Sequence, residues 1–472
     1  MQTKIPDLII ALKDEDWRVR ESAAEAIGKI GVNDEQFETI LRMLKKGETS
    51  EERHGAAIAL GELKNLKAIP ALITALKDED WSVRSSAAEA IGKIAEANPG
   101  KEVLEAITAL INALKDEDSD VRLSAAEAIR EIAEANQGNK EVLEAITALI
   151  NALKDDYSRV RESAAEAIGK IGEANPNSKE VLEAIPALIT ALKDNNKDVR
   201  KRAAEVIGKI GVNDEQFETI VRMLKEGETW EERHGAAIAL GELKNLKAIP
   251  ALITALKDNN KDVRKRAAEA IEKIAEINPN SKEVLEAIPA LITALKDEDS
   301  DVRLSAAEAI GKIAEANPGK EVLEAVPALI TALKDENSVV RLSAAEAIGK
   351  ISEKLVEEHI KLAEQAIEKG EFEEALKAIR TATFTIAKFY EDVFLMEKKI
   401  NKTMGKDRDL LEKRREILEK LQSLTNRIYE IMEKEGPRNP LNENEPMEWK
   451  LPKRNDGIGK ENAVKRDNRR HH

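Results

Sequence analysis

The sequence predicts an all-α protein, a solenoid of antiparallel helix pairs, on three observations. One phrase, a Val-Arg-like pair followed after two variable residues by Ala-Ala, recurs ten times in 472 residues. Successive copies lie 31 to 39 residues apart, a period typical of solenoids built from helical pairs. Aromatic residues make up only 3% of the chain, and Ala, Leu, Ile, Glu and Lys dominate it, which favours amphipathic helices over sheets. The arginines that mark the units are Arg20, Arg53, Arg84, Arg122, Arg161, Arg200, Arg233, Arg264, Arg303 and Arg341.

Each unit is predicted to contain two helices joined by a polar loop. In residues 180–193, apolar side chains recur at steps of three and four from Leu182 to Leu192, which indicates a first helix with one buried face. The second helix begins near Val199, and the small side chains of Ala203 and Ala204 would let neighbouring helices approach closely.

Capping residues and prolines mark the expected helix ends and bends. Asp16 stands where the second helix of the first unit needs an N-cap, and Asn177 or Ser178 can cap a later first helix. Prolines inside the first helices are expected to bend them, which suits a curved stack. These prolines are Pro186, Pro250, Pro289 and Pro327.

The composition excludes several classes of protein. The absence of cysteine excludes disulfides, zinc–thiolate sites and thiol catalysis. No apolar run approaches the roughly 18–20 residues of a membrane span, and the first residues show no signal-peptide pattern, so the simplest interpretation is a cytoplasmic protein without membrane contact. The formal net charge of −15 would repel nucleic acid phosphates, which argues against nucleic acid as a partner.

A larger duplication overlies the repeat. Residues 31–78 match residues 211–258 at an offset of 180, so a block of five units is present twice. Within the match three positions differ: Leu41 becomes Val221, Lys46 becomes Glu226 and Ser50 becomes Trp230. We therefore expect residues 1–352 to form one solenoid of ten units.

Two further segments are expected after the repeat stops at Ile351. Residues 353–435 are predicted to be helical, with a tetratricopeptide-like helix–turn–helix at 363–378 and an antiparallel hairpin that caps the solenoid. Self-association through residues 371–435 is the alternative to that cap. Residues 436–472 are expected to be disordered, with Trp449 as a candidate anchor for a partner. From Lys450 onward eight Lys and Arg outnumber three Asp and Glu, which makes this tail basic.

The repeated sequence resembles the HEAT repeat of the phycobilisome-lyase type. The resemblance covers about residues 1–352 and rests on Leu-Ile-Thr-Ala-Leu-Lys-Asp, a short acidic loop, and Val-Arg-x-Ser-Ala-Ala-Glu-Ala-Ile-Gly-Lys-Ile. It implies a right-handed superhelix whose second helices line the inner, concave surface. It also implies a ladder in which the repeated Asp and Arg of neighbouring units interact. The Asp residues are Asp14, Asp78, Asp116, Asp155, Asp194, Asp258, Asp297 and Asp335. Gly47 and Gly227 replace the Asp in two short units, where we expect looser stacking.

Two enzymes of this wider family provide the alternative to a non-catalytic protein. Deoxyhypusine hydroxylase holds a di-iron centre with His-Glu pairs in its second helices. Here Arg53-His54-Gly55 and Arg233-His234-Gly235 keep the histidine, lack the glutamate and are five units apart. Bilin lyases act through groups that we do not find in this sequence. We therefore assign no catalytic, cofactor-binding or metal-binding residue, and a HEAT-type accessory enzyme acting on a protein-bound group stays the alternative.

The exposed stripe of the second helices is the predicted binding surface. Five residues after the repeat Arg, eight units carry glutamate, and lysine usually follows four residues later, as in Glu25/Lys29 and Glu89/Lys93, so that this face neutralises itself. The variable position directly after the Arg is expected to project away from the core. Three of the four tryptophans, Trp17, Trp81 and Trp230, share the position three residues before the Arg, where they can anchor a partner or pack on a neighbouring helix.

The sequence thus predicts a non-catalytic scaffold that binds a protein or peptide along the concave solenoid surface. The candidate contact residues within the repeats are Trp17, Trp81, Trp230, Leu123, Leu304, Leu342, Ile58 and Ile238.

Overall fold

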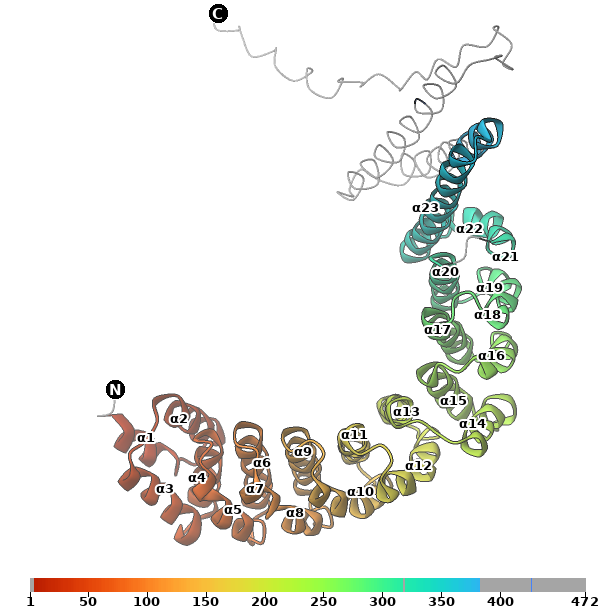
Figure 1. The fold of residues 1–472 in the computed structure, drawn as a ribbon. Helices are drawn as coiled ribbons and strands as arrows, with labels where there is room; N and C mark the ends of the chain where they lie inside the picture. The colour runs from red at the N-terminus through yellow and green to blue at the C-terminus, as the bar shows by residue number, and fades with distance from the viewer. Residues whose placement is uncertain (1–3, 317–318, 383–425, 427–472) are drawn as a thin grey trace, which may run out of the picture. The chain divides into compact units, whose positions relative to one another are not determined.

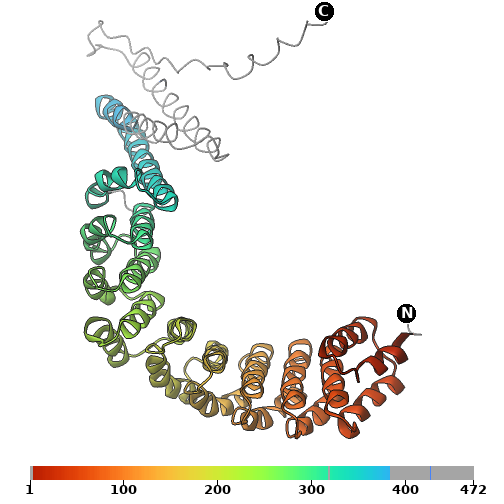
Figure 2. The same ribbon diagram turned by 180° about the vertical axis from the view of Figure 1, so that it is seen from behind.

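The computed structural model describes residues 4–316, 319–382 and Asn426. All regular structure in this part of the chain is helical, which confirms the predicted all-α solenoid. The chain divides into two compact units, and residues 4–358 belong to the first. In that unit each helix pair contributes one helix to each of two layers, and Figures 1 and 2 show the second helices along the inner side of the row.

The outer layer consists of the first helices, several of which are broken into two pieces. Its elements are α1 (Ile5–Ala11), α3 (Asp34–Lys46), η2 (Leu66–Ala68) with α5 (Ile69–Ala75), α7 (Lys101–Leu104) with α8 (Ile107–Ala113), η3 (Lys140–Ala145) with α10 (Ile146–Ala152), α12 (Lys179–Ala191), α14 (Asp214–Glu226), η4 (Leu246–Ala248) with α16 (Ile249–Ala255), α18 (Lys282–Glu286) with α19 (Ile288–Ala294), and α21 (Lys320–Leu323) with α22 (Val326–Ala332).

The inner layer consists of the longer second helices, which pack on one another in order along the row. They are α2 (Trp17–Ile30), α4 (Ser50–Glu62), α6 (Trp81–Ala97), α9 (Ser119–Ala135), α11 (Ser158–Ala174), α13 (Lys197–Ile210), α15 (Trp230–Leu243), α17 (Lys261–Ile277), α20 (Ser300–Ala314) and α23 (Ser338–Glu368). The described residues therefore contain the ten helix pairs that the repeat predicts. Residue 352, the expected end of the solenoid, lies inside α23.

The predicted caps are present. The Asp16 carboxylate accepts a hydrogen bond from the backbone N–H of Arg18 at 3.0 Å, and the Ser178 hydroxyl accepts one from that of Val181 at 3.3 Å. Each therefore satisfies an N–H that has no partner inside its own helix. The predicted buried face is wrong for one residue: Leu182, in the first turn of α12, is 47% exposed.

The prediction that prolines bend the first helices is wrong for three of the four. Pro250, Pro289 and Pro327 lie in the first turn of α16, α19 and α22, where a missing N–H leaves no helical hydrogen bond unmade. Of these four prolines, only Pro186 lies in the interior of a helix, beyond its first turn. In two other units the first helix is also broken at this point, before α8 and α10, although no proline is present there. The break is therefore a feature of the repeat and does not require proline.

Glycines set the close spacing of the inner layer. A Cβ added to Gly61 of α4 would lie 2.9 Å from the Cα of Ala90 in α6, so the two backbones are in contact. In the short units, a Cβ on Gly55 or Gly235 would lie 2.0 Å from a backbone oxygen of the preceding unit. The looser stacking expected in the short units is therefore wrong, because their backbones approach their neighbours very closely.

The described part of the second unit begins at residue 359, within α23. The chain turns at Gly370, whose φ of +76° favours glycine, and is helical again over residues 372–382. The expected helix–turn–helix at 363–378 is thus present, whereas the hairpin of residues 371–435 and the tail of 436–472 lie almost wholly outside the described residues. No helix in the described part of the chain is long and apolar enough to cross a membrane.

Candidate protein-binding surface

An arginine–aspartate ladder joins the loops of neighbouring units, as the family resemblance implies. In each rung, Nε and Nη2 of the Arg donate to both carboxylate oxygens of the Asp in the next unit; for Arg303 and Asp335 the distances are 2.7 and 2.8 Å. Nη1 of Arg303 donates to the carbonyls of Asp297 and Glu298 in its own loop. The other rungs are Arg53–Asp78, Arg84–Asp116, Arg122–Asp155, Arg161–Asp194, Arg233–Asp258 and Arg264–Asp297.

The ladder explains why so many charged groups are buried in the stack. Arg303 is only 8% exposed. Its hydrogen bonds hold the pKa of Asp335 below the usual value, because they favour the ionised carboxylate. Since both charges of each rung are paired in bidentate geometry, the ladder fixes the loops at the start of successive second helices beside one another.

Two joints lack the aspartate and use a histidine instead. Nε of Arg20 donates to Nδ1 of His54 at 3.1 Å, and Nε of Arg200 donates to Nδ1 of His234 at 3.2 Å. An aspartate cannot replace Gly227 without a shift, because a Cβ there would lie 2.5 Å from the backbone oxygen of Met223. Both histidines thus accept hydrogen bonds at joints of the solenoid, a role that the spacing of residues in the sequence does not indicate.

His234 is held neutral by its surroundings. It is 5% exposed, and Nε of Arg266 lies 3.3 Å from its second ring nitrogen. Burial, with the charges of Arg200 and Arg266, lowers its pKa to about 3; burial and Arg20 lower that of His54 to about 4. Within the described residues no group of three or more His, Asp or Glu side chains could hold a metal ion.

A second ladder of ion pairs covers the exposed side of the inner layer. The predicted pairs within one helix are present, with Lys29 3.1 Å from Glu25 and Lys93 2.8 Å from Glu89. The same lysine position also reaches the preceding unit. These pairs are Lys93–Glu62, Lys170–Glu134, Lys209–Glu173, Lys273–Glu242 and Lys350–Glu315. Much of the charge on this face is therefore neutralised within the molecule.

α9 departs from the pattern and carries an unusual carboxylate. Arg130-Glu131 stands where most units have Gly-Lys, and the Glu131 carboxylate lies directly over Gly92 of α6. Burial raises the pKa of Glu131 to about 7; Arg130 opposes the shift, and the carboxylates of Glu127, Glu96 and Glu89 add to it.

The structure separates the candidate contact residues into exposed and buried groups. Trp17 and Trp81 are exposed, by 55% and 48%. Leu123 and Ile238 are each only 8% exposed, so the expectation that residues directly after the Arg project from the core is wrong for Leu123. The reason is that this position meets the next second helix, as the 2.9 Å contact between the hydroxyls of Ser85 and Ser124 shows.

The remaining candidates are partly covered or not described. Trp230 is half-buried, with the Arg200 guanidinium 5.0 Å from its ring centre and His234 edge-on at 5.9 Å, so this tryptophan has the packing role that was favoured for the three. Trp449 lies outside the described residues. The half-buried apolar candidates are Ile58, Leu304 and Leu342.

Sequence reasoning missed one exposed aromatic residue. Tyr157 is 39% exposed and directly precedes α11, one position before the place that Trp17 and Trp81 occupy in their units. The loop Asp155-Asp156-Tyr157 shows this tyrosine in the sequence. A comparison of units at the tryptophan position misses it, because Tyr157 stands four residues before its Arg instead of three.

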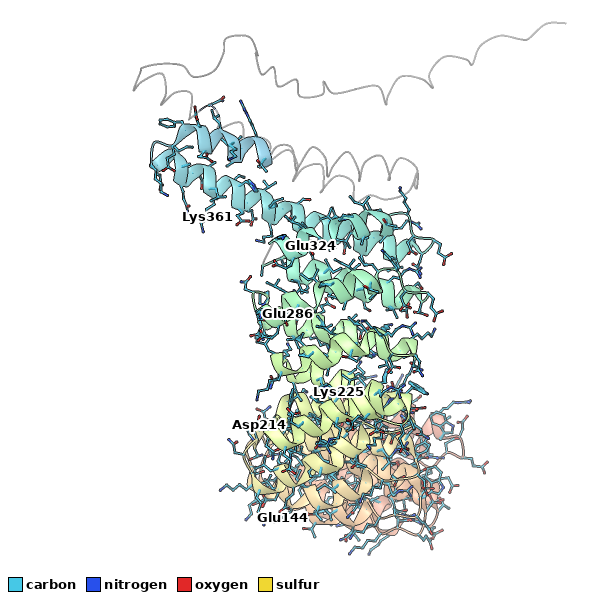
Figure 3. The ribbon with its side chains drawn as sticks, turned by 90° about the vertical axis from the view of Figure 1, so that its right-hand side faces the viewer. Glu144, Asp214, Lys225, Glu286, Glu324 and Lys361 are labelled. Atoms are coloured by element: carbon cyan, nitrogen blue, oxygen red, sulfur yellow. The ribbon has the colours of Figure 1, made fainter. Side chains whose placement is uncertain are left out.

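The outer layer offers charged side chains and shallow hollows. Figure 3 faces part of this layer and labels Glu144, Asp214 and Glu286 among the side chains that project from it. An open groove of about 690 Å³ lies between Glu144 and Lys140 on one side and Pro176 on the other.

Comparison with protein families agrees with this architecture. HEAT-repeat models match residues 5–32, 37–130, 107–185, 146–229, 217–288 and 288–382. The chain belongs to the HEAT-repeat family. The last match of this HEAT-repeat protein includes the helix–turn–helix at 363–378, and no curated protein matches the sequence.

Solved structures share the fold at low sequence identity. They include Kap95p with RanGDP (17% identity, TM-score 0.64, covering 89% of this chain and 55% of that one). Importin beta in ammonium sulfate (16%, 0.58, 90% and 64%) and the Kap95:Nup1 complex (15%, 0.57, 90% and 63%) also match. This chain spans about half to two thirds of the length of these proteins, and the likeness concerns the fold alone.

Proposed function

We propose that this HEAT-repeat protein is a non-catalytic scaffold that holds a protein partner along its second-helix face. The observation that carries the proposal is the continuous inner layer, in which each second helix from α2 to α20 packs on the next and Gly311 of α20 lies against Ala347 of α23. Such a layer offers an extended surface of repeated chemistry, which suits an elongated partner. Two of the solved neighbours are complexes with other proteins, Kap95p with RanGDP and Kap95 with Nup1, which supports the same class of function.

The structural role of His54 and His234 argues against the enzymatic alternative. Nδ1 of His54 accepts a hydrogen bond from Arg20 and Nδ1 of His234 accepts one from Arg200, so this nitrogen of each ring is engaged in joining neighbouring units. A bilin lyase or a di-iron hydroxylase needs a chromophore pocket or several carboxylate and imidazole ligands at one place. Metal analysis and absorbance of the purified protein test this directly: we expect neither stoichiometric iron nor a chromophore band.

Finer assignments rest on the sequence. We infer the phycobilisome-lyase type of HEAT repeat from the Val-Arg-x-Ser-Ala-Ala phrase, and we propose a cytoplasmic location because no apolar run is long enough to span a membrane. Residues 353–435 and 436–472 are proposed as a helical cap and a basic tail, with self-association through residues 371–435 as the alternative for the former.

Site-specific crosslinking tests the scaffold proposal. A photo-crosslinking amino acid is placed at Glu89 or Glu308, both exposed on second helices, or at the control positions Asp214 and Glu286 on the outer layer. We expect partners to crosslink from Glu89 and Glu308 and not from the controls. Equal crosslinking from both layers would contradict binding along the second-helix face.

A further inference from the structure

The exposed aromatic residues of the solenoid lie along one edge of the inner layer. Trp17 and Trp81 are the first residues of α2 and α6, and Tyr157 directly precedes α11. Their exposed fractions are 55%, 48% and 39%. Large exposed aromatic rings are unusual on a solvated surface and mark contact sites for other molecules. We call these three residues the aromatic rim.

The arginine–aspartate ladder aligns the loops that carry Trp81 and Tyr157, and the Arg20–His54 hydrogen bond joins the unit of Trp17 to the second unit. Arg53 binds Asp78, Arg84 binds Asp116, and Arg122 binds Asp155, so the loops before α6, α9 and α11 lie side by side. The aromatic rings belong to the first, third and fifth units. Since packed helices lie about 8–10 Å apart, successive rings are separated by about 20 Å, the length of roughly six residues of extended chain.

Acidic side chains surround the rings. Each rim loop places an exposed acid next to the capping position, namely Glu15, Glu79 and Asp156. The side chain of Glu79 is 88% exposed although its carboxylate lies 3.3 Å from Arg53. The sequences are Asp14-Glu-Asp-Trp17, Asp78-Glu-Asp-Trp81 and Asp155-Asp-Tyr157. A ring flanked by carboxylates attracts a cation both through the charge and through the ring face, and Arg18 already lies 5.6 Å from the ring centre of Trp17.

The duplicated half of the molecule lacks this chemistry. At the offset of 180, Trp17 becomes Lys197 and Trp81 becomes Lys261, and both loops read Asp-Asn-Asn-Lys. The fold is retained, since Asn196 and Asn260 cap α13 and α17 as the aspartates cap α2 and α6. The rim is therefore a surface feature of the first half and is not needed for the repeat to fold.

We propose that the aromatic rim binds an extended, lysine- and arginine-rich peptide segment of a partner protein. The proposal deepens the scaffold function and rests on it. Charge complementarity selects this occupant, because the same acidic loops repel nucleic acid phosphates and anionic membrane surfaces. Cationic side chains about six residues apart reach successive rings, and those between them lie over the acidic loops of the intervening units.

The two copies supply a matched test of the rim. The rim variant carries Glu15→Asn, Asp16→Asn, Trp17→Lys, Glu79→Asn, Asp80→Asn and Trp81→Lys, which installs the loops of the sixth and eighth units. The control variant makes a nearly equal charge change in loops without aromatic rings: Glu298→Asn, Asp299→Asn, Ser300→Lys, Glu336→Asn and Ser338→Lys. Because residues 195–197 and 259–261 already carry the new sequence, we expect unchanged circular dichroism and melting temperature for the rim variant.

The probe is a fluorescein-labelled 14-residue peptide of Gly and Ser with Lys at every third position, measured by fluorescence anisotropy on the full chain. We expect the rim variant to bind it at least tenfold more weakly than the unmodified protein, and the control variant to change by less than threefold. An equal loss in both variants, or equally tight binding of a peptide with Glu in place of Lys, would overturn the proposal. If partners still crosslink from Glu308 in that case, only the proposed peptide binding at the rim is refuted, and the proposed scaffold function is kept.

Discussion

Trp230 illustrates how one residue compensates for a missing charge partner. Arg200 is 1% exposed, and the next unit offers it His234 in place of the usual aspartate. Burial lowers the pKa of Arg200, the expected direction for a cation without a carboxylate partner. The Trp230 ring lies 5.0 Å from the guanidinium carbon and covers it. In the first copy Ser50 occupies this place, so Arg20 has the histidine without the ring.

Exchanging the two residues should therefore have opposite effects in the two copies. We expect Trp230→Ser to lower the free energy of unfolding by about 1–3 kcal/mol, the range of a desolvated cation–π contact together with lost apolar burial. Ser50→Trp should raise it by up to about 1 kcal/mol, because Arg20 gains the missing ring. Urea denaturation measures both. Destabilisation by Ser50→Trp would show that the two joints differ in more than this residue.

Glu131 makes stability depend on pH in a predictable direction. Its pKa in the folded protein is about 7, above the ordinary 4.5, so the folded state binds more protons than the unfolded state between these values. The free energy of unfolding therefore falls as the pH rises through this window. We expect Glu131→Gln to stabilise the protein by about 1–3 kcal/mol at pH 8, and to have little effect at pH 4. Paired urea titrations at the two pH values test this, and a pH-independent difference would contradict it.

Contact partners of single residues were only partly predictable from the sequence. The Asp–Arg ladder followed from the family resemblance, and the pairs Glu25–Lys29 and Glu89–Lys93 from spacing within one helix. Burial of Leu123 and the role of His54 were not predictable in this way. Both depend on how far the next second helix is displaced along its neighbour, which the spacing within a single helix does not encode.

At the scale of helices, the inner layer depends on glycine as much as on alanine. Most units carry a glycine eight residues after the repeat Arg. At five of them an added Cβ would lie 2.9–3.2 Å from a backbone atom of the next second helix: Gly28, Gly61, Gly208, Gly241 and Gly311. The sequence suggested close approach through paired alanines, which are indeed buried, as Ala203 and Ala204 show. The start of a second helix was predictable where a capping residue marks it, as Asp16 does, whereas α11 begins after Tyr157 without a side-chain cap.

A graded series of Gly→Ala substitutions tests this packing. A Cβ would lie 2.0 Å from Leu192 O at Gly235, 2.9 Å from Ala270 Cα at Gly241, and 3.2 Å from Ala347 Cα at Gly311. Alanine favours an isolated helix by up to about 1 kcal/mol, whereas overpacking costs about 1–3 kcal/mol. We expect the loss of stability to fall in the order Gly235, Gly241, Gly311, measured by thermal or urea unfolding. Equal stabilisation by all three would mean that propensity outweighs packing.

At the scale of the whole solenoid, stability is local because each unit touches mainly its neighbours. Val19 in the first unit is 38% exposed, whereas the equivalent Val83, Val121 and Val160 are fully buried. The difference arises because no unit precedes α1 and α2 in the described chain. The period predicted the number of units, but exposure at an end depends on which neighbour is missing.

Hydrogen exchange should therefore vary along the stack. We expect backbone amides of α2 to exchange faster than those of α9 under native conditions, since opening the first unit exposes less apolar surface and breaks contacts on one side only. Mass spectrometry of peptides from the two helices measures this difference. Equal protection of α2 and α9 would indicate that residues 4–358 unfold as a single cooperative body.

The repeated block has a consequence for how the gene can change. Ile30-Gly31 and Ile210-Gly211 are the same dipeptide, and each opens the same stretch of sequence. Loss of residues 31–210 by recombination between the copies would place α14 after α2 and bring His234 to Arg20, the pairing that His54 makes today. At this joint the shortened protein would differ from the present one only where the two copies differ, with Trp230 in place of Ser50 beside Arg20. Such a gene can lose or gain five units in one step, while its product keeps the pattern of contacts that the repeat already makes.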